Sequence, residues 1–160
     1  MSLPPFQDHV DRLSTPLRRH LVALVGPDEA DDVTQETLIS ALRAYPDLDP
    51  DADVRAWMWR IARNKAIDRY RARGRTPSTV PLDEATHGTA GQHGSAPTGP
   101  DDSLWAAVRR LPLGQRQAVA LRFVDDLTYA DIGRYCECSP GAARQRVHEA
   151  LRTLRQEVRP

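Results

Sequence analysis

The fold of this chain is decided by the stretch Leu127-Thr-Tyr-Ala-Asp-Ile-Gly-Arg-Tyr-Cys-Glu-Cys-Ser-Pro-Gly-Ala-Ala-Arg-Gln-Arg-Val-His-Glu-Ala-Leu151. Its apolar spacing predicts a short helix near 128–136 and a second near 139–158, and Ser139 followed by Pro140 is typical of a helix start. Only two residues separate these helices, so the chain must turn tightly between them. We therefore predict a helix-turn-helix, and the side chains expected at its crossing are Ala130, Ile132, Ala143 and Val147.

The second of these helices has two chemically different faces. At 100° per residue, its apolar face carries Ala143, Val147, Ala150, Leu151, Leu154 and Val158. Its opposite face carries Arg144, Gln145, His148, Arg152, Arg155 and Arg159. Arg and Gln side chains suit base edges in a major groove, and further Arg side chains suit phosphates. This pattern favours a duplex-reading face over the alternative, a solvated face of a helical bundle.

The rest of the chain is predicted to be all-α. Apolar residues recur at three- and four-residue steps, which indicates further helices near 6–25, 28–45, 53–73, 101–111 and 114–124. Between them, residues 76–100 contain four Gly, four Pro, five Thr and two Ser, too little apolar surface to offset the entropy of ordering. We therefore predict two small helical domains, about 1–75 and 101–160, joined by a flexible linker over 76–100.

The helix near 53–73 carries a second candidate site. One face holds the expected core residues Val54, Trp57, Met58, Ile61 and Ala62, and the other holds Arg55, Trp59, Arg63, Ala66, Tyr70 and Arg73. Arg interleaved with aromatic rings suits a single nucleic-acid strand, because rings stack on bases while guanidinium groups hold the backbone. The alternative for Trp59 and Tyr70 is packing against the first helix.

The helix near 28–45 is acidic and has one unusual position. Its inward face is expected to hold Ala30, Val33, Thr37, Ala41 and Tyr45. Its outward face holds Asp32, Gln35, Glu36, Ser40 and Arg43 around the β-branched Ile39. An exposed apolar residue ringed by polar groups is a candidate docking spot for a partner helix, although single exposed apolar residues are also common.

Charge is distributed in blocks, although 22 basic and 22 acidic side chains cancel overall. Residues 26–54 carry nine acidic side chains against one basic, and residues 55–75 carry eight basic against one acidic. Residues 104–160 carry ten basic side chains against six acidic. The neutral total therefore does not exclude a nucleic-acid partner.

Other classes are excluded or disfavoured by composition. The longest apolar run, Leu21–Val25, has five residues, far too few to span a membrane, and the N-terminus lacks the pattern of a secretory signal. We therefore expect a cytoplasmic protein without membrane insertion. One residue separates Cys136 from Cys138 and no convincing ligand spacing accompanies them, so we expect no metal, cofactor or catalytic site.

Three motifs in this order resemble those of the extracytoplasmic-function (ECF) sigma factors of the bacterial sigma-70 family. Asp31–Leu38 resembles the family's polymerase-binding helix, and Arg55–Asp68 resembles its promoter-melting and minus-ten helix. Leu111-Pro112, Arg116, Leu121-Arg122, Leu127–Ile132 and Ser139–His148 resemble its minus-thirty-five-binding domain. The resemblance implies a promoter-specificity subunit whose partners are core RNA polymerase and promoter DNA, with an anti-sigma factor as a further candidate.

The resemblance also implies roles for individual residues. Core polymerase is expected to contact Asp32, Gln35, Glu36, Ile39 and Arg43. Minus-ten DNA is expected to contact Arg55, Trp59, Arg63, Asn64, Tyr70 and Arg73. Minus-thirty-five DNA is expected to contact Ser139, Arg144, Gln145, Arg146, His148, Arg152 and Arg155.

Two positions depart from the family pattern. Glu137 stands in the turn of the helix-turn-helix where the family usually has Gly, which predicts mild backbone strain or a reshaped turn. The loop 46–53 carries four Asp residues in the region where the family holds a flipped base. The sequence therefore does not define which minus-ten base this chain prefers.

Two other classes of function remain as alternatives. In a stand-alone helix-turn-helix regulator, the N-terminal half would serve dimerisation or sensing. In a helical interaction protein, neither basic face would contact DNA. The order of the N-terminal motifs argues against the first, and the segregated Arg faces argue against the second.

Overall fold

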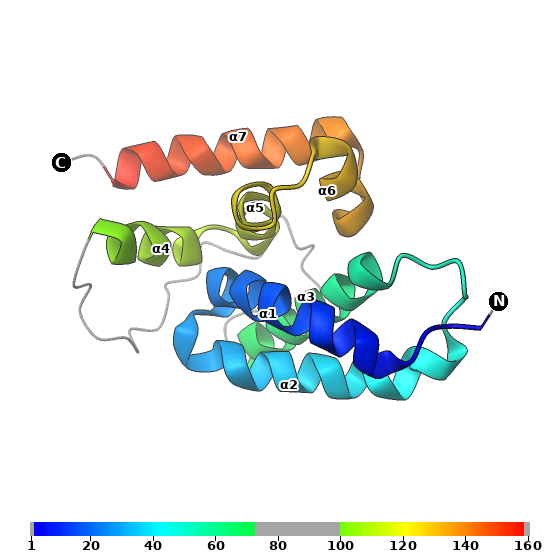
Figure 1. Ribbon diagram of the computed structural model, residues 1–160. Helices are drawn as coiled ribbons and strands as arrows, with labels where there is room; N and C mark the ends of the chain where they lie inside the picture. The colour runs from blue at the N-terminus through cyan, green and yellow to red at the C-terminus, as the bar shows by residue number, and fades with distance from the viewer. Residues whose placement is uncertain (1, 73–99, 159–160) are drawn as a thin grey trace.

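The structure is a computed structural model that describes residues 2–72 and 100–158, and these residues form helices and connecting turns without a strand (Figure 1). The helices are α1 (Phe6–Val25), α2 (Pro27–Ala44), α3 (Val54–Ala72), α4 (Pro100–Arg110), α5 (Leu113–Val119), α6 (Tyr129–Cys136) and α7 (Pro140–Glu157), with a 3₁₀ turn η1 (Tyr45–Asp47) and a π-helical turn η2 (Ala120–Val124). The prediction of an all-α fold is confirmed. Apart from Pro100, which begins α4, the predicted linker 76–100 lies outside the described residues.

The N-terminal half is a bundle of α1, α2 and α3. Leu17, Leu21 and Leu24 of α1 are fully buried and belong to one core cluster with Val33 of α2 and Met58 of α3. Pro16 does not interrupt α1, which continues to Val25. Gly26 then takes a φ of 88°, which few other residues adopt cheaply, and Pro27 begins α2 at once. This tight corner keeps α1 and α2 side by side.

The C-terminal half packs α4, α5 and α6 against the long helix α7. A second core cluster joins Val108 and Leu111 at the end of α4 to Val119, and to Ala150 and Leu154 of α7. The predicted apolar face of α7 is buried at Ala143, Val147, Ala150 and Leu154, half-buried at Leu151 and exposed at Val158. The opposite side of α7 is therefore the side that remains accessible to a partner.

The helix-turn-helix forms as predicted, with one correction at its crossing. Thr128 and Ser139 cap α6 and α7 by accepting hydrogen bonds from backbone N–H groups three residues on, at 3.2 and 3.0 Å. Ala130 is exposed, so placing it at the crossing was wrong. Gly133 lies there instead, because a Cβ at this position would be 2.6 Å from the carbonyl oxygen of Cys138. Only a residue without a side chain fits so close to the turn.

The turn itself bears out the expected backbone strain. Glu137 adopts φ 55° and ψ 44°, in the left-handed region that a non-glycine residue occupies at a cost. The N–H of Cys138 donates to the carbonyl of Gly133 at 2.9 Å and closes the turn. The hydrogen bond and the two caps therefore hold Glu137 in a conformation that glycine would adopt more easily.

The two halves are stacked on each other (Figure 1). The main core cluster includes Leu113, Leu121 and Ile132 of the C-terminal half together with Leu17 and Met58 of the N-terminal half. The sequence divided the chain into two domains but did not predict that they share buried apolar surface. This contact decides which of the candidate residues face solvent.

Gly133→Ala should destabilise the protein by about 1–3 kcal/mol, because the added methyl group meets a backbone carbonyl that cannot move without opening the turn. The matched control is Gly141→Ala in the first turn of α7, where the nearest atom is the Ser139 hydroxyl at 3.9 Å. This control should be neutral or stabilising by up to about 1 kcal/mol. Equal urea midpoints for the two variants would contradict the close approach.

Candidate nucleic-acid interface

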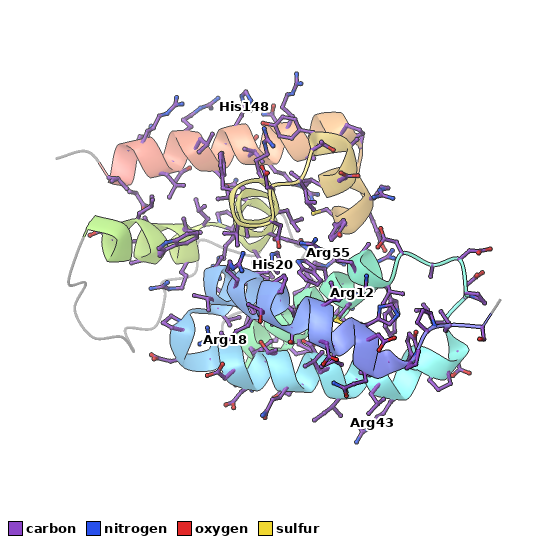
Figure 2. The ribbon with its side chains drawn as sticks, in the orientation of Figure 1. Arg12, Arg18, His20, Arg43, Arg55 and His148 are labelled. Carbon is purple, nitrogen blue, oxygen red and sulfur yellow. The ribbon has the colours of Figure 1, made fainter. Side chains whose placement is uncertain are left out.

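The exposed side of α7 is the first candidate surface. Arg144, Gln145, His148, Arg152 and Arg155 are exposed, so the predicted reading face is confirmed as a surface. His148 points outward from α7, away from the other helices (Figure 2). Arg159, predicted on the same face, lies outside the described residues. We call the five exposed side chains the α7 reading face.

Side chains of α6 and η2 hold the first reading residue in place. The guanidinium carbon of Arg144 lies 5.3 Å from the ring centroid of Tyr129, and that of Arg122 lies 5.2 Å from the same centroid. Arg122 also donates to the carbonyl of Leu127 at 3.0 Å. These cation–π contacts orient Arg144 before any ligand arrives. The sequence places Tyr129 in the first helix of the helix-turn-helix but does not indicate this role.

The two other residues predicted on this surface, Ser139 and Arg146, both make contacts within the chain, and that of Arg146 is a side-chain hydrogen bond with Cys136. The hydroxyl of Ser139 is the N-cap acceptor of α7, and Arg146 is half-buried. On the reading face itself, Gln145 donates to Glu149 at 2.9 Å. The positive charge of the α7 reading face comes from its exposed guanidinium groups.

The second candidate surface, on α3, needs a correction. Trp59 is fully buried, and its ring centroid lies 5.9 Å from that of His20 on α1. Placing Trp59 on the exposed face was therefore wrong, and the alternative that it packs against the first helix is what the structure shows. Ala66 is also fully buried, so neighbouring helices cover more of α3 than its periodicity indicated. On the predicted core face, Met58 and Ala62 are buried, whereas Val54, Trp57 and Ile61 are half-buried.

The remaining α3 residues stay near the surface. Arg55, Arg63 and Tyr70 are half-buried and Asn64 is exposed, while Arg73 lies outside the described residues. The guanidinium carbon of Arg55 lies 4.8 Å from the Trp59 ring centroid, and its Nη2 lies 3.4 Å from Asp125 of the C-terminal half. We call Arg55, Arg63, Asn64 and Tyr70 the α3 basic face.

A buried arginine connects the two halves beside this face. Arg116 of α5 is 2% exposed, and its guanidinium donates to the carbonyl of Leu24 at 2.6 Å, to the carbonyl of Leu111 at 2.9 Å and to the hydroxyl of Tyr70 at 3.0 Å. Burial lowers the pKa of Arg116 from its ordinary value. Sequence reasoning noted Arg116 only as part of a family motif, because its partners are distant in sequence.

The loop before α3 uses part of its acidic charge for its own structure. The carboxylate of Asp53 accepts from the N–H of Ala56 at 3.0 Å and so caps α3, and that of Asp49 accepts from the N–H of Asp51 at 2.9 Å. Asp47 is exposed. Two of the four carboxylates therefore have a local structural task, which the sequence alone did not indicate.

The third candidate surface is the outward side of α2. Ile39 is 50% exposed and is surrounded by exposed Asp32, Gln35, Glu36 and Arg43, as predicted. Leu42, three residues further along, is 55% exposed and widens the apolar spot, which sequence reasoning missed. Arg43 points outward from α2 (Figure 2). We call these six residues the α2 docking face.

The environment of Cys136 disfavours a reactive thiol. Burial raises the pKa of the Cys136 thiol to about 11, so this thiol is uncharged and a poor nucleophile near neutral pH. In the described ranges 2–72 and 100–158, no group of three or more His, Cys, Asp or Glu residues is placed to hold a metal ion. In the same ranges, no helix combines the length and the apolar character needed to cross a membrane.

An all-helical chain with a capped helix-turn-helix and an Arg-rich outer face belongs to the class of DNA-binding proteins. Comparison with known proteins gives the family. The family model for sigma-70 region 2 matches residues 6–76, and that for sigma-70, region 4 matches residues 101–154. The chain therefore belongs to the sigma-70 family.

Relatives place the chain in the ECF group of that family. It is 32% identical over 139 residues to an ECF RNA polymerase sigma factor, EcfG, of Rhodopseudomonas palustris, covering 86% of this chain and 76% of the relative. It is 29% identical over 147 residues to the ECF RNA polymerase sigma-E factor of Escherichia coli K12, covering 85% and 77%. Among solved structures, it resembles the sigma factor RpoE of Bartonella quintana, in complex with the anti-sigma factor NepR, with a TM-score of 0.72 and 26% identity over 96% of each chain. The resemblance that the motifs indicated is confirmed, and the chain acts as an RNA polymerase sigma factor in transcription initiation.

Proposed function

We propose that three surfaces of this sigma factor have separate roles in transcription initiation. The α2 docking face binds core polymerase, the α3 basic face together with Arg73 binds the opened minus-ten region, and the α7 reading face binds the minus-thirty-five duplex. The observation that carries the proposal is the α7 reading face: a row of exposed Arg and Gln side chains whose helix is fixed from behind by the buried core. On this proposal the chain is a cytoplasmic transcription factor rather than an enzyme.

The proposed function is tested by run-off transcription with core polymerase and a genomic promoter library. We expect transcripts that start at a restricted set of promoters and that depend on the chain. Sequence-specific binding of the chain alone to a palindromic duplex as a dimer, without any stimulation of core polymerase, would favour the stand-alone helix-turn-helix regulator.

Ile39→Asp should weaken core polymerase binding by about 2 kcal/mol or more, because an apolar anchor at the centre of a docking face is replaced by a charge. The fold should survive, since Ile39 is half exposed in the free chain. The control is Leu104→Asp, which alters an apolar residue of α4 that is 39% exposed and lies outside the docking face. Equal affinity of both variants and the unmodified chain for core polymerase would show that α2 is not the docking helix.

Arg144→Ala should weaken binding to the minus-thirty-five duplex by about 1–3 kcal/mol and relax the preference at one or two base pairs, because this guanidinium lies early on α7 and is oriented by Tyr129. The matched control is Arg155→Ala, further along the same helix, which should weaken all sequences alike. A promoter-variant screen measures both. An equal loss of affinity for all promoter variants in Arg144→Ala would show that Arg144 contacts phosphates rather than base edges.

An anti-sigma factor is the remaining proposed partner. The Bartonella sigma factor that this chain resembles was solved with its anti-sigma factor. In this chain, a groove of about 730 Å³ lies between the two halves and is lined by Arg18 and Arg19 of α1, Trp105 of α4 and Phe123 of η2. Phe123 is 59% exposed there. A partner that covers Phe123 would contact both halves at once.

A further inference from the structure

We propose that Glu149 is a positioning residue for base recognition: its carboxylate orients the amide of Gln145 so that this side chain reads adenine in the minus-thirty-five duplex. The inference rests on the proposed role of the α7 reading face and deepens it by assigning one base to one side chain. Glu149 acts through Gln145 and does not itself have to touch the DNA.

Glu149 places a negative charge next to the α7 reading face. The acidic residues of α7 are Glu149 and Glu157. Glu157, at the end of the helix, pairs with Arg110 of α4, whose Nη2 lies 3.1 Å from its carboxylate. Glu149 instead lies one helical turn after Gln145 and directly follows the exposed His148. A carboxylate at this place repels phosphates, so it lowers the affinity for every DNA sequence alike.

Amide groups on two helices hold the carboxylate of Glu149. Its Oε1 accepts a hydrogen bond from Nε2 of Gln145 at 2.9 Å, and its Oε2 lies 3.5 Å from Nε2 of Gln115 on α5. Gln115 and Glu149 are half-buried, whereas Gln145 is exposed. The contact with α5 therefore restrains the carboxylate on its inner side, and the exposed amide of Gln145 is the group that the carboxylate orients.

The chemistry of this pair decides which way the Gln145 amide faces. A carboxylate can only accept hydrogen bonds, so Gln145 must turn its nitrogen, and not its oxygen, toward Glu149. This contact uses one of the two N–H groups of the amide. The carbonyl oxygen and the second N–H group remain available to a ligand.

The groups that remain available match adenine. In the major groove, adenine presents its N6 amino group as a donor and N7 as an acceptor, and a Gln side chain pairs with both at once. The oxygen of Gln145 would accept from N6, and its second N–H group would donate to N7. Guanine presents two acceptors, N7 and O6, so the carbonyl oxygen of Gln145 would meet O6 and be repelled. Glu149 therefore removes the arrangement of Gln145 that suits guanine.

The first alternative is that the pair only stabilises α7. A side-chain hydrogen bond between residues four apart on a helix contributes little to its stability. α7 is already capped by Ser139 and anchored by the buried Val147 and Ala150. The helix therefore does not depend on the pair, and the main effect of Glu149 falls on the orientation of Gln145.

The second alternative is direct readout by Glu149. A carboxylate can accept from the N4 amino group of cytosine without the help of another side chain. In that case Glu149 and Gln145 would act independently and on different bases. A double-mutant cycle separates this role from positioning, because only positioning makes the effect of one substitution depend on the other.

The test measures the base preference of holoenzyme formed from the full chain and core polymerase. The probes are duplexes from a promoter that the run-off assay identifies, with each base pair of the minus-thirty-five element changed in turn. The variants are Gln145→Ala, Glu149→Ala and the two combined, and the control Glu157→Ala removes the same charge from the same helix. Preference is a ratio of two affinities, so a uniform gain from losing a negative charge cancels. Circular dichroism and urea unfolding check that all variants stay folded, as expected for Ala within a helix.

Gln145→Ala should lose a preference of about tenfold for adenine at one base pair. Glu149→Ala should lose most of the preference at that same base pair, because the freed amide can turn and also donate to guanine. The double variant should lose no more than Gln145→Ala alone. Glu157→Ala should keep the preference of the unmodified chain.

Full retention of the preference by Glu149→Ala would overturn the positioning role. A further loss in the double variant, or a loss at a different base pair, would show direct readout by Glu149 and would overturn it equally. A preference for another base at the shared position would overturn the assignment to adenine. The proposed function fails separately, if the unmodified chain gives no promoter-dependent transcripts in the run-off assay.

Discussion

The placement of the two halves depends on the buried guanidinium of Arg116. A charge in the interior is costly unless hydrogen bonds replace its hydration, and here two carbonyls and one hydroxyl do so for the two terminal nitrogens of the guanidinium. Two of these acceptors, on Leu24 and Tyr70, belong to the N-terminal half, so Arg116 is satisfied in the observed way only when α5 lies against α1 and α3. In the same position, Leu113, Leu121 and Ile132 are buried in one cluster with the N-terminal core, which adds apolar stabilisation.

The same contact gives the two proposed DNA-binding surfaces of this sigma factor different accessibility. The reading face of α7 is on the outside because Ala143 and Val147 anchor the opposite side of the helix in the core. The basic face of α3 lies at the junction, where Arg55 is near Asp125 and above the buried Trp59. Acidic groups within the chain also neutralise part of the basic charge, as in the pairs Arg18–Asp31 and Arg69–Glu36, both at 2.6 Å. Part of the basic charge is therefore paired with acidic side chains of the same chain.

Much of the fold was predictable because its causes are local. Helix bounds followed from apolar spacing, the cap of α7 from Ser139, and the strained turn from the family resemblance, in which Glu137 stands where glycine is usual. The exposed position of Ile39 on α2 was predictable for the same reason, since the opposite side of that helix is apolar. Each of these features depends on residues within a few positions of one another, which a sequence displays directly.

The sequence by itself determined the helices, the helix-turn-helix and its basic outer face, and the order of motifs that identifies an ECF sigma factor. Only the tertiary structure decided that Trp59 is core rather than surface, that Gly133 rather than Ala130 lies at the helix crossing, and that Arg116 and Asp125 bind the N-terminal half. Periodicity shows that a helix has two sides but not how many neighbours cover them. Asp125 and His20 are 105 positions apart along the chain, and no local pattern encodes a pairing across that distance.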